Sequence, residues 1–142
     1  MNGYLLDTNI LSEIRKSRCS PTIKVSAWWE TMKSESVFLS VLVLGEVRKG
    51  IDILGRRDPA TGLVLERWLK ETSDAFAGKI LNVNLETALR WGQLSAIRTL
   101  PQVDGILAAT ALIHDLTLVT RNIDDFRGLG LRVFNPFTGE QS

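Results

Sequence analysis

Short unbroken apolar runs alternate along this chain with longer stretches in which apolar residues recur every three or four positions. An apolar run that ends at a turn residue is typical of a parallel strand covered on both faces. A recurrence of three to four is typical of an amphipathic helix. The runs predict strands over residues 4–6, 37–39, 79–84, 116–120 and 131–134. The recurrences predict helices over residues 10–14, 21–32, 41–54, 63–76, 85–96 and 102–115, and a helical turn over 123–129.

Turn and capping residues mark the ends of several of these elements. Pro21 and Pro101 stand where a helix would begin, and Ser40 can cap the helix that follows it. A turn is expected over residues 56–61. Strands that alternate with helices predict an α/β fold, with a mostly parallel sheet of four to five strands flanked by helices on both faces. Residues 138–142 are expected to form a flexible C-terminal tail.

Composition narrows the class of protein. A chain of 142 residues with 44% hydrophobic content fits one domain with its own core. No run reaches the roughly 18 apolar residues of a membrane span, so no membrane association is expected. The single Cys19 excludes a disulfide framework and a multi-cysteine zinc site, and a reducing, cytoplasmic location is the simplest interpretation. The single His114 excludes paired-histidine chemistry, and we expect it to be structural.

Charge gives little indication of a polyanion partner. The 17 basic residues nearly balance the 16 acidic ones, so any nucleic acid would have to be held by local basic clusters. Such clusters are also typical of ordinary solvated surface. The candidate clusters are Arg15, Lys16 and Arg18, then Arg48 and Lys49, then Arg56 and Arg57.

Several acids stand at places where each has an ordinary structural explanation. Asp7 follows a strand and is either the N-cap of the next helix or a ligand at the sheet edge. Asp104 lies in the first turn after Pro101, where the helix dipole favours a negative charge. Asp124 and Asp125 follow another strand, with Thr120 or Asn122 available as a cap.

Glu46 is the acid whose position is hardest to explain by structure alone. Its helical neighbours at three and four residues are Leu42, Val43 and Gly50, so we expect it on a packed, inward stripe, where an unpaired carboxylate is costly. The alternative is an edge position from which the side chain reaches solvent.

Taken together, the acids indicate a shared site. The carboxyl ends of parallel strands and the helix starts that follow them lie on one edge of a sheet, so these carboxylates are expected to converge. Unpaired, they would repel one another, and a hard divalent cation, Mg²⁺ or Mn²⁺, would relieve that repulsion. Asp7 is then interpreted as a metal ligand, which leaves Thr8 or Asn9 to cap the helix.

A site of carboxylates around a divalent cation suits metal-assisted phosphodiester hydrolysis. Possible orienting groups for waters or ligands are Thr8, Asn9, Thr120 and Asn122, each of which is equally explained as a turn or cap residue.

The order of LLDTNILSE, GEVRKGI, VDGILAATALIHDLTLVTRNIDDF and VFNPF resembles the PIN-domain ribonucleases, specifically the VapC/FitB-like toxins of bacterial toxin–antitoxin pairs. The resemblance implies one PIN-like domain over residues 1–137. It implies that Asp7, Glu46 and Asp104 match the metal-binding acids of the family. Many members carry an aspartate at the position of Asn122, and others carry an acid three residues later. We therefore assign Asp125 as the fourth acid, with Asn122 as a water-mediated ligand and Asp124 as the weaker alternative.

The resemblance further implies cleavage of RNA, often tRNA or rRNA, that depends on Mg²⁺ or Mn²⁺. It implies a homodimer that is blocked by a small antitoxin, which also binds the DNA of the operon. In several relatives an arginine of the antitoxin reaches the acidic pocket. Four tryptophans could serve a dimer or antitoxin groove, although ordinary helix packing is the favoured explanation for each: Trp28, Trp29, Trp68 and Trp91.

Two other classes of protein fit part of the pattern. One is a PIN-like binding module that docks an antitoxin or nucleic acid without turnover, and whose acidic pocket mainly holds a basic partner or a metal. The other is a receiver-type phospho-acceptor domain, which also gathers acids at strand ends. The second fits poorly, because the chain has no convincing lysine after a late strand.

Overall fold

A single sheet organises the chain. The computed structural model describes residues 3–16, 23–32 and 36–142. The strand order is β3-β2-β1-β4-β5-β6, in which the first five strands run parallel and β6 pairs antiparallel with β5. The prediction of a mostly parallel α/β sheet is confirmed. The strands are β1 (Gly3–Leu6), β2 (Val37–Ser40), β3 (Ile80–Leu81), β4 (Leu116–Val119), β5 (Val133–Asn135) and β6 (Glu140–Gln141).

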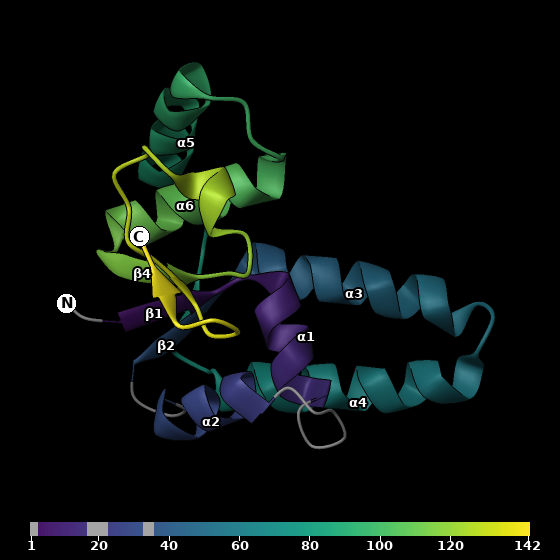
Figure 1. Ribbon diagram of the computed structural model, residues 1–142. Helices are drawn as coiled ribbons and strands as arrows, with labels where there is room; N and C mark the ends of the chain where they lie inside the picture. Colours follow the sequence, from purple (N-terminus) through teal and green to yellow (C-terminus); the bar gives the residue numbers. More distant parts are fainter. Residues whose placement is uncertain (1–2, 17–22, 33–35) are drawn as a thin grey trace.

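Helices cover both faces of this sheet (Figure 1). Helices α5 and α6 lie on one side of the strands and α2 and α4 on the other, while α3 and α4 pack as a hairpin that extends away from the sheet. No helix in residues 3–16, 23–32 or 36–142 is long and apolar enough to cross a membrane. The helices are α1 (Thr8–Lys16), α2 (Ile23–Met32), α3 (Val41–Gly55), α4 (Pro59–Ala75), α5 (Leu85–Ile97) and α6 (Gln102–Ile113), followed by the 3₁₀ helix η1 (Ile123–Phe126).

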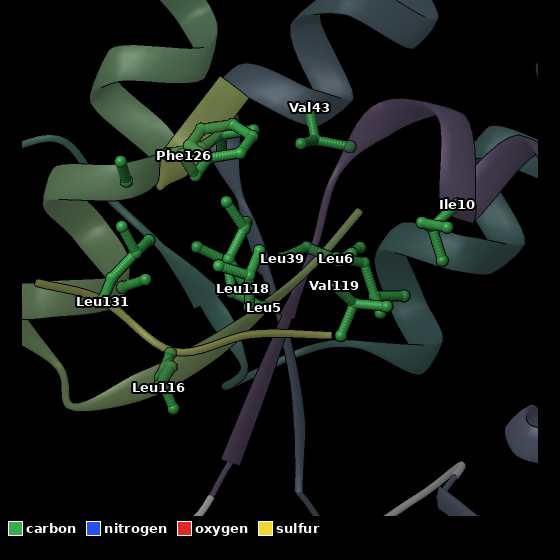
Figure 2. Packing of buried hydrophobic residues seen from close by; sticks show 14 of the residues in the cluster. Leu5, Leu6, Ile10, Leu39, Val43, Leu116, Leu118, Val119, Phe126 and Leu131 are labelled. Carbon is green, nitrogen blue, oxygen red and sulfur yellow. The ribbon is translucent and has the colours of Figure 1, made fainter. Parts of the chain in front are cut away.

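The core is built on the central strands (Figure 2). Leu5, Leu6, Leu39, Leu118 and Val119 have no exposed surface, because successive side chains of a strand point to opposite faces and both faces are covered. All four tryptophans pack against this core as partly buried side chains, as helix packing predicts.

Capping residues account for where the helices begin. Ser40 caps α3 as predicted, because its hydroxyl accepts a hydrogen bond from the Leu42 amide at 3.1 Å. Helix α4 begins at Pro59 rather than at residue 63, since the Asp58 carboxylate accepts from the Thr61 amide at 3.2 Å and a proline suits the first helical turn. The predicted turn over residues 56–61 is correspondingly too long.

Two predictions about strands need correction. The strand expected over residues 79–84 is limited to Ile80–Leu81, because Asn84 caps α5 through the Thr87 amide. The tail expected over residues 138–142 instead contains β6, since Gly139 turns the chain back at a φ of 80° and Ser142 exchanges backbone hydrogen bonds with Val133. Arg18, Cys19 and Pro21 lie outside the described residues.

Helix α5 approaches the start of α6 closely, at a point where only glycine fits. A Cβ atom at Gly105 would lie 2.8 Å from Cδ1 and 2.9 Å from Nε1 of Trp91. We expect Gly105→Ala to lower the free energy of unfolding by about 1–3 kcal/mol, the usual cost of overpacking. Denaturant titration measures this. The matched control is Gly92→Ala, because Gly92 is an α5 residue with nothing near its missing Cβ, and it should be neutral or slightly stabilising. Equal unfolding midpoints for Gly105→Ala and the wild type would contradict the packing argument.

Candidate functional site

The site lies where the strand order changes direction. From β1 the sheet extends on one side through β2 and on the other through β4. In open α/β sheets, ligands bind outside the carboxyl ends of the strands at such a point. Asp7 follows β1 and Thr120 follows β4, and the Asp7 amide donates to the Val119 carbonyl at 3.1 Å. The DTN and TRN segments are therefore adjacent at this edge.

Asp7 both caps α1 and faces the site. Its side chain is 8% exposed, its Oδ1 accepts from the Ile10 amide at 2.9 Å, and Thr120 donates a second hydrogen bond to its carboxylate. The prediction that Thr8 or Asn9 would cap this helix is wrong, because Asp7 supplies the capping oxygen and Thr8 is already helical. Asp7 thus caps α1 and lines the cavity at the same time, so its capping role does not exclude metal ligation.

Three predicted acids come together in one cavity. Asp7 reaches it from the end of β1, Glu46 from α3 and Asp104 from the first turn of α6. The cavity has a volume of about 280 Å³, and its lining residues are Asp7, Thr8, Asn9, Glu46, Asp104 and Leu107. Every polar residue of this lining is one that the sequence analysis proposed for the site. It did not identify Leu107 as a lining residue, because Leu107 belongs to the packed stripe of its helix.

Glu46 is exposed, so the prediction of an inward stripe is wrong. The buried stripe of α3 is Val43, Val47 and Ile51, at a spacing of four residues, and Glu46 lies beside it. The hydroxyl of Thr8 donates a hydrogen bond to the Glu46 carboxylate. Glu46 therefore stands at the cavity wall in contact with solvent and is oriented by α1.

Burial and mutual repulsion act together on the carboxylates. Burial is the largest effect on Asp7 and raises its pKa. The hydrogen bonds from Ile10 and Thr120 lower this pKa, but the charges of Asp104 and Glu46 raise it further. Burial also raises the pKa of Asp104, with additional contributions from Glu46 and Asp125. The negative charges in this cavity are thus incompletely compensated by the protein.

Asp125 stays at the margin of the site. It is exposed on η1 and does not line the cavity, although its charge acts on Asp104. Arg98, at the end of α5, donates a hydrogen bond from Nη2 to the Asp125 carbonyl oxygen and so ties η1 to α5. No sequence signal distinguished Arg98. Asp124 instead pairs with Arg127 at 2.6 Å, which leaves Asp125 as the more available of the two acids.

The remaining polar residues follow the same edge. Asn122 is exposed just before η1. Its backbone amide donates a hydrogen bond to the Thr120 hydroxyl at 3.1 Å. Asn9 is exposed at the cavity. Within the described parts of the chain, no three acid, histidine or cysteine side chains are drawn together closely enough to form a ligand cluster. The structure gathers Asp7, Glu46 and Asp104 around one cavity without bringing them into ligand contact.

The donor set of the cavity fits a hard divalent cation. It consists of carboxylate, hydroxyl and amide oxygens, which Mg²⁺ and Mn²⁺ prefer over nitrogen and sulfur. His114 lies at the opposite end of α6 from Asp104. A cation would also relieve the repulsion that raises the pKa values of Asp7 and Asp104. The residues present therefore suit such an ion.

The chain is similar to known proteins over nearly all of its length. The chain is 33% identical over 140 residues to toxin FitB of Neisseria gonorrhoeae, covering 94% of this chain and 97% of that protein. It is 30% identical over 138 residues to the VapC ribonuclease Y4jK of Sinorhizobium fredii, covering 94% and 96%. The crystal structure of FitAcB from Neisseria gonorrhoeae superposes with a TM-score of 0.84 at 33% identity, covering 94% of this chain and 98% of that one. The PIN domain family matches residues 4–130, and the chain belongs to that family, among its FitB- and VapC-like toxins.

Proposed function

We propose that this protein is a divalent-metal-dependent endoribonuclease and the toxin of a toxin–antitoxin pair. The observation that carries the proposal is that Asp7, Glu46 and Asp104, from three separate elements, line one polar cavity at the carboxyl edge of the sheet. Nuclease activity is also supported by membership of the PIN domain family and by the ribonuclease names of its relatives. We take tRNA or rRNA as the substrate class, in line with the resemblance.

Each residue of the site has a specific task in this proposal. Asp7, Glu46 and Asp104, with Asp125 as a fourth acid, would hold Mg²⁺ or Mn²⁺. The ion, when bound, lowers the pKa of a water and stabilises charge on the phosphodiester oxygens. Thr120 and the Ile10 amide orient the Asp7 carboxylate, and Thr8 orients that of Glu46. The exposed amides of Asn9 and Asn122 are available to position waters.

The proposed partners are a small DNA-binding antitoxin, operator DNA and a second copy of this chain, in the cytoplasm. One solved structure that resembles this chain, with a TM-score of 0.81 at 32% identity, is described as FitAB bound to the IR36 DNA fragment. An antitoxin that reaches the acidic cavity would compete with substrate, so adding it should inhibit cleavage.

The test is cleavage of RNA by the purified protein, freed of antitoxin. We expect discrete fragments from total tRNA or rRNA with Mg²⁺ or Mn²⁺, and none when EDTA is present. A DNA of matching length serves as the control for substrate class. If the protein binds Mn²⁺ by calorimetry and yet cleaves no RNA at any pH tested, the endonuclease proposal fails. The binding module without turnover, which the marginal position of Asp125 also permits, would then be the better explanation.

A further inference from the structure

We propose that Arg121, which rests on the ring of Phe137, binds a backbone phosphate of the RNA beside the acidic cavity. This inference rests on the proposed function, because it assigns a substrate contact to that site. An acidic cavity repels a polyanion, and the chain as a whole carries a formal charge of only +1. A local cation next to the carboxylates is therefore needed to hold the substrate.

The position of Arg121 is fixed by its neighbours in the sequence. Thr120, the preceding residue, is buried and hydrogen-bonds the Asp7 carboxylate, and Asn122 follows at the base of η1. The backbone of Arg121 thus leaves β4 at the same edge of the sheet as the cavity, one residue beyond the group that holds the Asp7 carboxylate. Its side chain is exposed, so it is accessible to a strand of RNA that enters the site.

A buried asparagine holds Arg121 and Phe137 in register. Asn135 is 5% exposed; its Nδ2 donates to the Arg121 carbonyl at 3.2 Å, and its Oδ1 accepts from the Phe137 amide at 2.9 Å. The carbon of the Arg121 guanidinium then lies 3.7 Å from the centroid of the Phe137 ring. Stacking on the aromatic face restricts the guanidinium. Its N–H groups lie in the plane of the guanidinium, so the stacked ring does not block them. The cation is therefore positioned before substrate arrives.

The charge of Arg121 is also uncommitted, in contrast to that of three other arginines of the chain. Arg48 pairs with Asp52 and Glu66, Arg127 with Asp124 and Glu140, and Arg132 with Asp115. Within the described ranges, no carboxylate forms an ion pair with Arg121, and its guanidinium donates no hydrogen bond to another described residue. A planar guanidinium with free donors is well suited to bidentate recognition of a phosphate.

The test measures RNA binding separately from cleavage. Fluorescence anisotropy with a labelled, mixed-sequence single-stranded RNA is recorded over a range of salt concentrations, with Asp104→Asn in all proteins to prevent turnover. Adding Arg121→Gln should raise Kd by roughly fivefold to tenfold at low salt and reduce the slope of log K against log [salt] by about 0.7, the value for one lost phosphate contact. Phe137→Leu should raise Kd by about twofold to fivefold and leave that slope unchanged, because the charge remains.

The matched control is Arg67→Gln, an exposed arginine of α4, a helix that contributes no residue to the cavity lining, and it should change neither Kd nor slope. An unchanged Kd and slope for Arg121→Gln, or an equal change for Arg67→Gln, would overturn the inference. Cleavage by the wild type together with unaltered binding by Arg121→Gln would mean that this inference alone fails. Loss of binding in Arg121→Gln without any cleavage by the wild type would mean that the phosphate contact stands and the proposed nuclease function does not.

Discussion

Asp7→Asn and Asp104→Asn are each expected to lower the rate of metal-dependent RNA cleavage by at least about 100-fold while the fold stays intact. Loss of a residue that merely supports a metal ligand typically costs about 10- to 100-fold, and loss of a ligand should cost more. Asparagine retains the oxygen that accepts from the Ile10 amide, and it caps a helix about as well as aspartate. Initial cleavage rates and circular dichroism of the same preparations measure the two effects.

The control for this experiment is Asp58→Asn. Asp58 caps α4 through the Thr61 amide in the same way that Asp7 caps α1, but it does not line the cavity. We expect Asp58→Asn to cleave at the wild-type rate. If Asp7→Asn also cleaved at the wild-type rate, Asp7 would be a cap and nothing more.

Without a divalent ion, the same two substitutions are expected to stabilise the protein at neutral pH. The raised pKa values of Asp7 and Asp104 mean that the folded state binds protons more tightly than the unfolded chain does. Each carboxylate therefore does not lower the free energy of unfolding below its ordinary pKa of 3.8; its destabilising contribution grows between that pKa and the raised one, and is fully present above it. The variants should thus melt above the wild type at pH 7 and converge with it in acid.

Thermal unfolding in EDTA between acid and neutral pH measures this difference. Comparison of each variant with the wild type removes the opposite contributions of Asp58 and Asp115, whose pKa values are lowered by hydrogen bonds from Thr61 and Arg132. Mn²⁺ at 100 times its Kd should stabilise the wild type by about 2.7 kcal/mol. It should stabilise Asp104→Asn much less. A melting temperature that Mn²⁺ leaves unchanged in the wild type would argue against a metal site.

Residues whose position follows from chain direction could be predicted from the sequence. Asp7 ends a buried strand and Asp104 begins a helix, and both positions follow from the apolar pattern and from Pro101. The rotation of α3 could not be predicted in the same way. Leu42 and Gly50 suggested an inward face, but the face that packs is the one carrying Val43 and Val47.

The location of Asp125 depends on contacts that no local pattern reveals. Arg98 holds the Asp125 carbonyl across 27 residues of sequence, and Asn135 holds that of Arg121 across 14. These long-range hydrogen bonds orient the loop and η1 after β4. Similarly, β6 exists because Gly139 reverses the chain, whereas the sequence of the tail has no strand-like alternation.

The measurement that tests the central claim most directly is the initial rate of RNA cleavage as Mn²⁺ is titrated into metal-free protein, for the wild type and for Glu46→Gln. Glu46 is exposed, so this substitution should leave the fold unchanged. We predict no cleavage without Mn²⁺, a saturable rise as it is added, and a midpoint at about 10-fold or more higher Mn²⁺ for Glu46→Gln. Cleavage that persists in EDTA, or identical midpoints for the two proteins, would contradict the account.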